Sequence, residues 1–234
     1  MRVCILIPAY NGSRTIGELV QNLFRYVGAV IVVDDGSYDD TYLKAKDAGA
    51  VVLKHNKNRG KGAALRTGFE YAAGEGYEAV ITIDADGQHD WRDVPLFINE
   101  AENGNADIIL GTRMGNCEGM PFIRLLTNVV TSRIVSFLSR QKITDSQMGY
   151  RLIRREVLEN VNLITSNYDM ESEILLKAAR KGFRITEIPV RTIYGSQSSK
   201  INRLVDTFRF VKLIFKMAAS WQLAVYGKKR EKFY

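Results

Sequence analysis

Apolar runs alternate with helical patterns along the first 110 residues of the chain. Short runs rich in branched aliphatic residues predict buried strands at 3–7, 29–33, 50–53, 79–83 and 107–110. The segments between them have the spacing of helices, at 15–26, 39–48, 61–73 and 91–103. Strands that alternate with helices are typical of parallel βαβ units. The sequence therefore predicts an α/β fold with a mostly parallel sheet flanked by helices.

The pattern changes after Gly111. A helix is expected at 121–139, followed by a polar loop at 144–151 and a further helix at 169–181. Two short extended pieces, 184–188 and 190–193, flank Pro189. From 201 to 234, charged positions recur at three- and four-residue steps with bulky apolar residues between them, which predicts an amphipathic helix. We therefore expect a catalytic domain at 1–200 and a helical tail at 201–234.

The tail is the most basic part of the chain. It holds eight Lys or Arg against two acidic residues, and so carries most of the net charge of +7. Its longest uncharged run, 217–227, has 11 residues, well short of the roughly 20 needed to cross a bilayer. Together with Trp221, this pattern favours a helix that lies in a membrane interface. A helix packed on the protein or on a second subunit would have the same sequence pattern. Nucleic acid is not expected as a partner, because bulky aliphatics interrupt the basic stripe.

Bulk composition is that of an ordinary globular protein. The hydrophobic share is 46% and the charged share 25%, and two cysteines are too few for a disulfide framework. Met1 and Arg2 lead straight into the first predicted strand, with no targeting signal before it. We expect a cytoplasmic protein with reduced thiols, associated peripherally with the cytoplasmic face of a membrane.

The most informative polar segment is Asp-Ala-Asp-Gly-Gln-His at 84–89, which directly follows an apolar run. Carboxylate and amide oxygens suit Mg²⁺ or Mn²⁺, and Mg²⁺ is commonly shared with substrate phosphates. A solvated acidic turn would use the same residue types. The other predicted strands, however, also end in polar segments, at 10–11, 34–35 and 58–62. In open α/β sheets this edge is where ligands bind, so the four segments together predict a site.

The Gly-Lys-Gly segment at 60–62 opens a predicted helix, whose first amides could add to a positive field for phosphates. It has neither the glycine pattern of a dinucleotide-binding fingerprint nor the lysine spacing of a P-loop. A Rossmann dehydrogenase and a P-loop ATPase are therefore excluded.

With these segments assembled, the chain resembles the family 2 glycosyltransferases, and within them the polyprenyl-phosphate sugar transferases such as the dolichyl-phosphate mannose and glucose synthases. The likeness runs from residue 7 to about 200. It rests on seven segments in order: PAYNG at 8–12, VVDDGSYDDT at 32–41, NRGKGAAL at 58–65, DADGQH at 84–89, GTR at 111–113, TDSQMGYR at 144–151 and YGSQSSK at 194–200. The resemblance implies a Rossmann-like nucleotide-diphospho-sugar transferase fold.

The resemblance also implies a nucleotide-sugar donor site with Mg²⁺ or Mn²⁺ bridging the donor diphosphate. The metal group would be Asp84, Asp86 and Gln88. The donor-binding residues would be Pro8, Tyr10, Asn11 and Asp35 near the nucleobase and ribose, Arg59 and Lys61 nearby, and Arg191 and Lys200 on the phosphates, with Asp84 shared between the two groups. The family usually has Glu after the Tyr-Asn pair where this chain has Gly12, which puts one ribose or base contact in doubt.

The resemblance implies a polyprenyl (dolichyl-type) phosphate as the acceptor. Such an acceptor is already anionic, so it needs cations to hold it rather than a general base. Arg113, Arg124 and Ser132 are the candidate acceptor contacts, although surface charge is an equal interpretation of Arg124. Asp86, Arg113 and Asp145 form the expected catalytic set, with Asp145 able to orient an active-site arginine. A single in-line displacement would invert the anomeric centre.

Two alternatives stay open. One is a family 2 transferase that uses a saccharide hydroxyl as acceptor, with Asp145 or Glu171 as the base. The other is a non-catalytic donor-binding subunit of a membrane glycosylation complex, with a membrane-protein partner or a second copy of the chain. The sequence does not choose among GDP-mannose, UDP-glucose and UDP-N-acetylglucosamine, although NRGKGAAL and DADGQH lean toward the glucose type.

Overall fold

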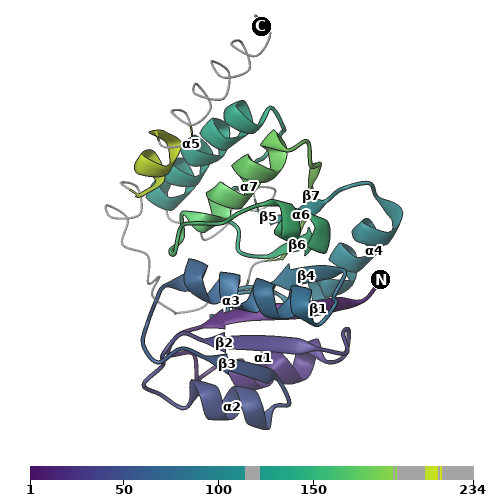
Figure 1. Ribbon diagram of the computed structural model, residues 1–234, viewed down its shortest axis with the longest axis vertical. Helices are drawn as coiled ribbons and strands as arrows, with labels where there is room; N and C mark the ends of the chain where they lie inside the picture. Colours follow the sequence, from purple (N-terminus) through teal and green to yellow (C-terminus); the bar gives the residue numbers. More distant parts are fainter. Residues whose placement is uncertain (114–121, 192, 194–208, 216, 218–234) are drawn as a thin grey trace, which may run out of the picture. The chain divides into compact units, whose positions relative to one another are not determined.

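The computed structural model describes residues 1–113, 122–191, 193, 209–215 and 217. Within these residues a seven-stranded sheet has the order β3-β2-β1-β4-β6-β5-β7 (Figure 1). Six of its strands run in the same direction, and β6 lies antiparallel between β4 and β5. The strands are β1 Val3–Ala9, β2 Val30–Asp34, β3 Val51–Lys54, β4 Ala79–Thr82, β5 Ile108–Thr112, β6 Arg151–Arg154 and β7 Ile185–Pro189.

Helices cover both faces of the sheet. They are α1 Ile16–Leu23, α2 Thr41–Asp47, α3 Lys61–Gly74, the 3₁₀ turn η1 Trp91–Asp93, α4 Val94–Asn103, α5 Phe122–Ser139, α6 Arg155–Asn160 and α7 Met170–Arg180. On one face, Ile5 and Ile7 pack into a core with Ile16 of α1 and Phe97 of α4. On the other, a Cβ placed on Gly68 of α3 would lie 2.1 Å from Leu6 Cδ1, so this helix crosses β1 at close range. Central strands buried on both faces explain why their sequences are continuously apolar.

The predicted α/β fold is confirmed, including all five strands and four helices expected before Gly111, within a few residues at their ends. The helices expected at 121–139 and 169–181 are α5 and α7, which pack against each other (Figure 1). The sequence interpretation missed β6 and α6. The first extended piece corresponds to β7, which ends at Pro189, whereas Val190 and Arg191 lie outside the strand. Pro189 is tolerated because β7 is an edge strand.

The chain divides into two compact units, Met1–Gln197 and Ser198–Tyr234. In the second unit the described residues, 209–215 and 217, are helical, in agreement with the helical pattern of the sequence. Lys200, Trp221 and most of the tail lie outside the described residues. Of the helices that the structure describes, none combines the length and the apolar character needed to cross a membrane.

Candidate functional site

Chain segments far apart in sequence meet at the carboxyl edge of β1, β2 and β4. Because β6 is antiparallel to β4, it begins where β4 ends, and Thr82 is paired with Arg151. Thr82 Oγ1 donates a hydrogen bond of 2.7 Å to the carbonyl of Gly149. The 144–151 loop therefore lies beside the 84–89 segment, as one site requires.

The loops after β1 and β2 are bonded to each other. The Asn11 amide donates to Ser37 Oγ at 2.9 Å, and Asn11 Oδ1 accepts the Tyr38 amide at 2.9 Å. Asn11 has a φ of +50°, a left-handed conformation that asparagine tolerates better than most residues. The Tyr10 ring meets that of Tyr38 edge-on, with centroids 6.3 Å apart. Tyr10 thus lies beside a pair of loops that Asn11 bonds together, whereas Pro8 is buried within β1, paired with Val33.

Asp35 organises the next loop. Its side chain is buried, and its two oxygens accept the backbone amides of Arg59 at 2.9 Å and Gly60 at 2.8 Å. His55, which the sequence interpretation did not single out, places Nδ1 2.6 Å from Asp35 Oδ1. Asp35 therefore shapes the loop that leads into α3 and leaves the Arg59 side chain exposed at its tip. Contact between Asp35 and a nucleobase or ribose stays a prediction.

The first amides of α3 have hydrogen-bond partners within the protein. Gly62 and Ala63 both donate to the carbonyl of Ser166, at 2.9 Å and 3.3 Å. A Cβ on Gly60 would lie 2.3 Å from that same oxygen, so the close approach requires glycine. The amides of residues 62 and 63 are therefore capped by a segment about 100 residues later, and a contribution of this helix start to the field at a phosphate stays a prediction.

Lys61 bridges two carboxylates. Its Nζ lies 2.6 Å from Asp84 Oδ1 and 2.6 Å from Glu171 Oε1. Burial on its own lowers the pKa of Lys61, but the two carboxylates outweigh it and raise that pKa above its ordinary value. Burial raises the pKa of Asp84, whereas Lys61 and His89 together hold it well below its usual range. Lys61 is therefore a cation and Asp84 an anion at neutral pH.

The second aspartate of the pair, Asp86, sits in a tight turn. Asp86 Oδ1 accepts the Gln88 amide at 2.9 Å, and Gly87 between them has a φ of +72°. Asp84, Asp86 and Gln88 are all partly exposed at the sheet edge. A Cβ on Gly149 would lie 2.6 Å from Asp84 Oδ2, so the 144–151 loop lies directly against Asp84.

These residues fit a hard divalent cation. Two carboxylates and an amide oxygen from one turn are oxygen donors, and an ion bound to one or two carboxylates can complete its coordination with phosphates and water. Over residues 1–113 and 122–191 no group of three or more His, Cys, Asp and Glu side chains forms a complete metal site. Lys61 already occupies Asp84 Oδ1, so Asp86 is the carboxylate better placed for direct coordination.

Arg113 and Asp145 form a buried ion pair at the end of β5. Arg113 Nε lies 3.0 Å from Asp145 Oδ2, with the two side chains 6% and 0% exposed. Asn128 of α5 donates to Asp145 Oδ1 at 2.8 Å, and the Asp145 amide donates to Glu187 Oε1 at 3.2 Å. The arrangement agrees with the predicted role of Asp145 in orienting an arginine. A role for Asp145 as a general base would require this ion pair to open, because the carboxylate is fully buried and paired.

The other two candidates for the acceptor contact are Ser132 and Arg124. Ser132 is buried, and its Oγ accepts the Ser146 amide at 2.9 Å and lies 3.2 Å from Asn128 Oδ1. Ser132 therefore fastens α5 to the 144–151 loop, and its contact with an acceptor phosphate stays a prediction. The side chain of Arg124 lies outside the described part of the chain, as does Lys200.

Arg191 has a different partner from the predicted donor phosphates. Its guanidinium contacts Asp93 Oδ1 through Nε at 2.9 Å and Nη2 at 2.5 Å, and Asp90 Oδ2 lies 3.4 Å away. Hydrogen bonding to Asp93 raises the pKa of Arg191. The side chain is more than half exposed, but its charge is directed at the start of α4 rather than at Asp84 or Asp86.

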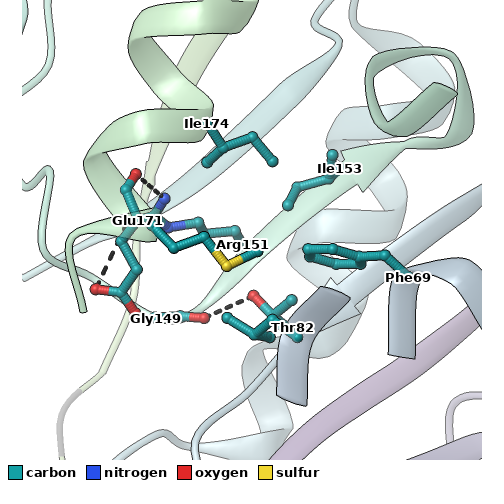
Figure 2. A pocket seen from close by; sticks show the side chains of 9 residues that line it. Phe69, Thr82, Gly149, Arg151, Ile153, Glu171 and Ile174 are labelled. Atoms are coloured by element: carbon teal, nitrogen blue, oxygen red, sulfur yellow. Dashed lines mark hydrogen bonds and ion pairs between the residues drawn. The ribbon is translucent and has the colours of Figure 1, made fainter. Parts of the chain in front are cut away.

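Arg151 is the functional residue that sequence reasoning missed most clearly. It is buried, and it donates to the carbonyls of Met148 at 2.5 Å and Ser146 at 2.8 Å. It also donates to the carbonyl of Glu171 at 2.6 Å (Figure 2). Burial lowers its pKa. Beside it lies a cavity of about 20 Å³, lined by Thr82, Gly149, Arg151, Glu171 and apolar side chains, with room for about one water molecule (Figure 2). Arg151 thus ties the 144–151 loop to α7 and helps place Glu171 against Lys61.

Comparisons with known proteins agree with this geometry. The family model described as glycosyl transferase family 2 matches residues 4–161. A UDP-N-acetylglucosamine–dolichyl-phosphate N-acetylglucosaminyltransferase of Methanococcus voltae is 31% identical over 219 residues, which cover 84% of this chain and 87% of the relative. The dolichol-phosphate mannosyltransferase of Pyrococcus furiosus is 31% identical over 203 residues, which cover 81% of this chain and 56% of the relative.

Solved structures share the fold at lower identity. Glucosyl-3-phosphoglycerate synthase from Mycobacterium tuberculosis, in complex with Mn²⁺, UDP and glucosyl-3-phosphoglycerate, matches with a TM-score of 0.71 and 19% identity, covering 92% of this chain and 78% of that one. A complex of that enzyme with Mg²⁺ and UDP has a TM-score of 0.69. The predicted Rossmann-like sugar-transferase fold is confirmed. On the family match and on relatives of about 30% identity over most of the chain, this protein belongs to glycosyl transferase family 2 and is a glycosyltransferase.

Proposed function

We propose that this chain transfers a hexose from a nucleotide diphosphate sugar to a polyprenyl phosphate at a membrane surface, with inversion and with the help of Mg²⁺ or Mn²⁺. The names of its relatives support the acceptor, since the Methanococcus and Pyrococcus proteins are transferases for dolichyl phosphate. The complexes of the Mycobacterium enzyme with UDP and Mn²⁺ or Mg²⁺ support the donor class and the ion.

One observation carries the choice of a phosphate acceptor over a hydroxyl. Both candidate bases are already engaged by cations: Asp145 is 0% exposed against Arg113, and Glu171 Oε1 lies 2.6 Å from Lys61. A hydroxyl acceptor requires a base within reach, because it is a poor nucleophile at neutral pH. A phosphate monoester requires none, because its oxygens are negatively charged at that pH.

On the donor side, Asp86, Asp84 and Gln88 would hold the divalent ion. Bound there, the ion would neutralise the negative charge that grows on the diphosphate as the sugar bond breaks. Lys61 keeps Asp84 ionised and fixes its orientation, and Arg151 and Glu171 fix Lys61 in turn. Tyr10 and the braced loops after β1 and β2 would form the wall of the nucleoside pocket.

On the acceptor side, Arg113 is the cation at the end of β5 that would hold the phosphate. Asp145 and Asn128 set the orientation of its guanidinium before any ligand arrives, so little ordering is needed on binding. Among described residues we find no nucleophilic side chain placed for a covalent sugar intermediate, and a single in-line attack by the phosphate oxygen inverts the anomeric carbon.

Paired acceptors that differ only in their phosphate test this proposal. Purified chain with Mn²⁺ is given radiolabelled GDP-mannose, UDP-glucose or UDP-N-acetylglucosamine, together with either a polyprenyl phosphate or the matching free polyprenol. We expect labelled lipid with one donor and with the phosphate only. Transfer to the polyprenol or to saccharides but not to the phosphate would refute the proposed acceptor. Absence of nucleotide release with every pair would favour a non-catalytic subunit.

A further inference from the structure

Helix α5 has its polar face inward and its apolar face outward. On the inner side, Asn128 and Ser132 are buried and bonded to Asp145 and Ser146, and Ser136 exchanges two hydrogen bonds with the backbone of Ile143, at 2.7 Å and 2.9 Å. On the outer side, a row of large apolar side chains is between 36% and 82% exposed. These are Ile123, Leu126, Val130, Ile134 and Phe137, at steps of three and four residues.

This polarity is the reverse of an ordinary surface helix, which buries its apolar stripe and exposes its polar one. Single exposed apolar residues are normal, and α2 and α4 each carry one, Leu43 and Leu96. A continuous row on one helix face is different, because apolar surface of that extent marks an interaction site. The outer face of α5 therefore fits an apolar environment rather than water.

The charges around the row indicate which environment. From 122 to 142 the sequence contains four Arg or Lys and no Asp or Glu. Arg133, Arg140 and Lys142 are exposed. An apolar helix face in a stretch of sequence whose charged residues are all basic is typical of a helix that lies in the interface of an anionic bilayer. With 18 residues, α5 is about 27 Å long, and no described helix meets the criteria for crossing a membrane.

We propose that the outer face of α5 docks the catalytic unit itself on an anionic lipid surface, independently of the tail. This inference deepens the proposed function and rests on it for the identity of the acceptor. The inner face of α5 bonds Asp145 through Asn128, and Asp145 is paired with Arg113. A single helix therefore separates the lipid contact from the cation that would bind the acceptor phosphate. Docking through this face would bring Arg113 within one helix of the bilayer surface, where the phosphate of the lipid acceptor lies.

Vesicle binding by matched variants tests the proposal. The full chain is compared with the triple variant Ile123→Gln, Leu126→Gln, Phe137→Gln, using vesicles of phosphatidylcholine with phosphatidylglycerol. The control triple variant is Leu43→Gln, Leu96→Gln, Ile164→Gln, which alters apolar residues of similar exposure elsewhere. We expect the α5 variant to lose vesicle affinity by roughly tenfold or more, and the control to keep it. Equal affinity of all three proteins would overturn the proposal.

A fluorescent probe on α5 itself distinguishes membrane contact by this helix from binding of vesicles by the tail. With Cys117 replaced by Ser and Cys4 fully buried, a polarity-sensitive fluorophore is attached to Phe137→Cys or to the control Leu96→Cys. Vesicles should shift the emission of the first probe to shorter wavelength and leave the second unchanged. No shift at Phe137→Cys would overturn the proposal. So would loss of a dimer by the α5 triple variant without vesicles, since this face would then be an interface between two copies.

Transfer to a short-chain polyprenyl phosphate in solution separates this proposal from the proposed function. We expect the α5 triple variant to transfer at the rate of the unaltered chain under these conditions, because no membrane is involved. If neither protein transfers but the vesicle results hold, the proposed function fails and the docking surface stands. If both transfer and the vesicle results fail, only the docking surface is refuted.

Discussion

The two parts of the candidate site are built differently. Around β1, β2 and β4 the metal-group residues Asp84, Asp86 and Gln88 are partly exposed, and the loops are fastened by backbone amides, as in the pair that Asp35 accepts from Arg59 and Gly60. Around β5 and α5 the charged pair Arg113 and Asp145 is buried, and an apolar helix face lies outside it. The first arrangement suits a water-soluble, charged donor. The second suits an acceptor whose charged head is held close to a lipid phase.

The 144–151 loop joins the two parts. Asp145 at its start pairs with Arg113, whereas Gly149 near its end covers Asp84 and Lys61. Arg151 holds the loop in place through three carbonyls. A change in one part can therefore be transmitted to the other only through a segment that is itself tightly bonded.

The largest expected effect is on stability in the buried part. Asp145→Asn keeps the shape of the side chain but leaves the Arg113 charge buried without its partner, and should lower the free energy of unfolding by about 3–5 kcal/mol. Urea unfolding followed by circular dichroism measures it. Glu159→Gln, which breaks the exposed pair with Arg155, serves as the control and should change little. If the two variants are equally stable, burial of the Arg113–Asp145 pair does not support this part of the fold.

The next effect is on catalysis in the exposed part. Asp86→Asn removes the carboxylate best placed to hold a divalent ion, and should lower the transfer rate by about a hundredfold or more. Its unfolding midpoint should stay close to that of the unaltered chain, because Asp86 is partly exposed and bonded only within its own turn. Asp47→Asn, an exposed change on α2, is the control. Near-normal transfer by Asp86→Asn would show that the metal group is placed elsewhere.

A smaller effect, on the pH dependence of stability, is expected at Glu173 of α7. Glu173 is buried in α7. Burial raises the pKa of its carboxyl, but hydrogen bonds with Lys177 and Thr165 lower that pKa by more, so the net shift is downward. Because the folded pKa lies below the unfolded value of about 4.3, Glu173 stabilises the fold above that pH, and this contribution is lost as the pH falls through the lowered pKa.

Glu173→Gln should therefore cost about 1–2 kcal/mol at pH 7 and almost nothing near pH 2. Urea unfolding across this range measures the difference between the two proteins. A cost that does not change with pH would mean that shape, and not the charge of Glu173, holds the 164–165 backbone.

The sequence predicted the elements before Gly111 better than the segments after it. Strands β1, β2, β4 and β5 are aliphatic and buried on both faces, so their apolar pattern is visible in the local sequence. In β6, Arg151 and Arg154 flank only two apolar residues, and their guanidinium groups are satisfied by carbonyls such as that of Ala106, so its four residues read as polar. The partner of Gly62, Ser166, lies about 100 residues away, and no local pattern could reveal it.

The smallest effect on stability is expected at Arg191. The same variant tests the sequence prediction that Arg191 contacts the donor phosphates. Because its side chain is more than half exposed, Arg191→Ala should leave the unfolding midpoint unchanged within error, and its pairing with Asp93 predicts near-normal transfer as well. Lys181→Ala, also exposed, is the control. If transfer nevertheless falls tenfold and the donor KM rises with it, the guanidinium must leave Asp93 to meet the donor phosphates. The first part of the site would then close on its ligand, and the exposure of its charges would be a property of the empty protein only.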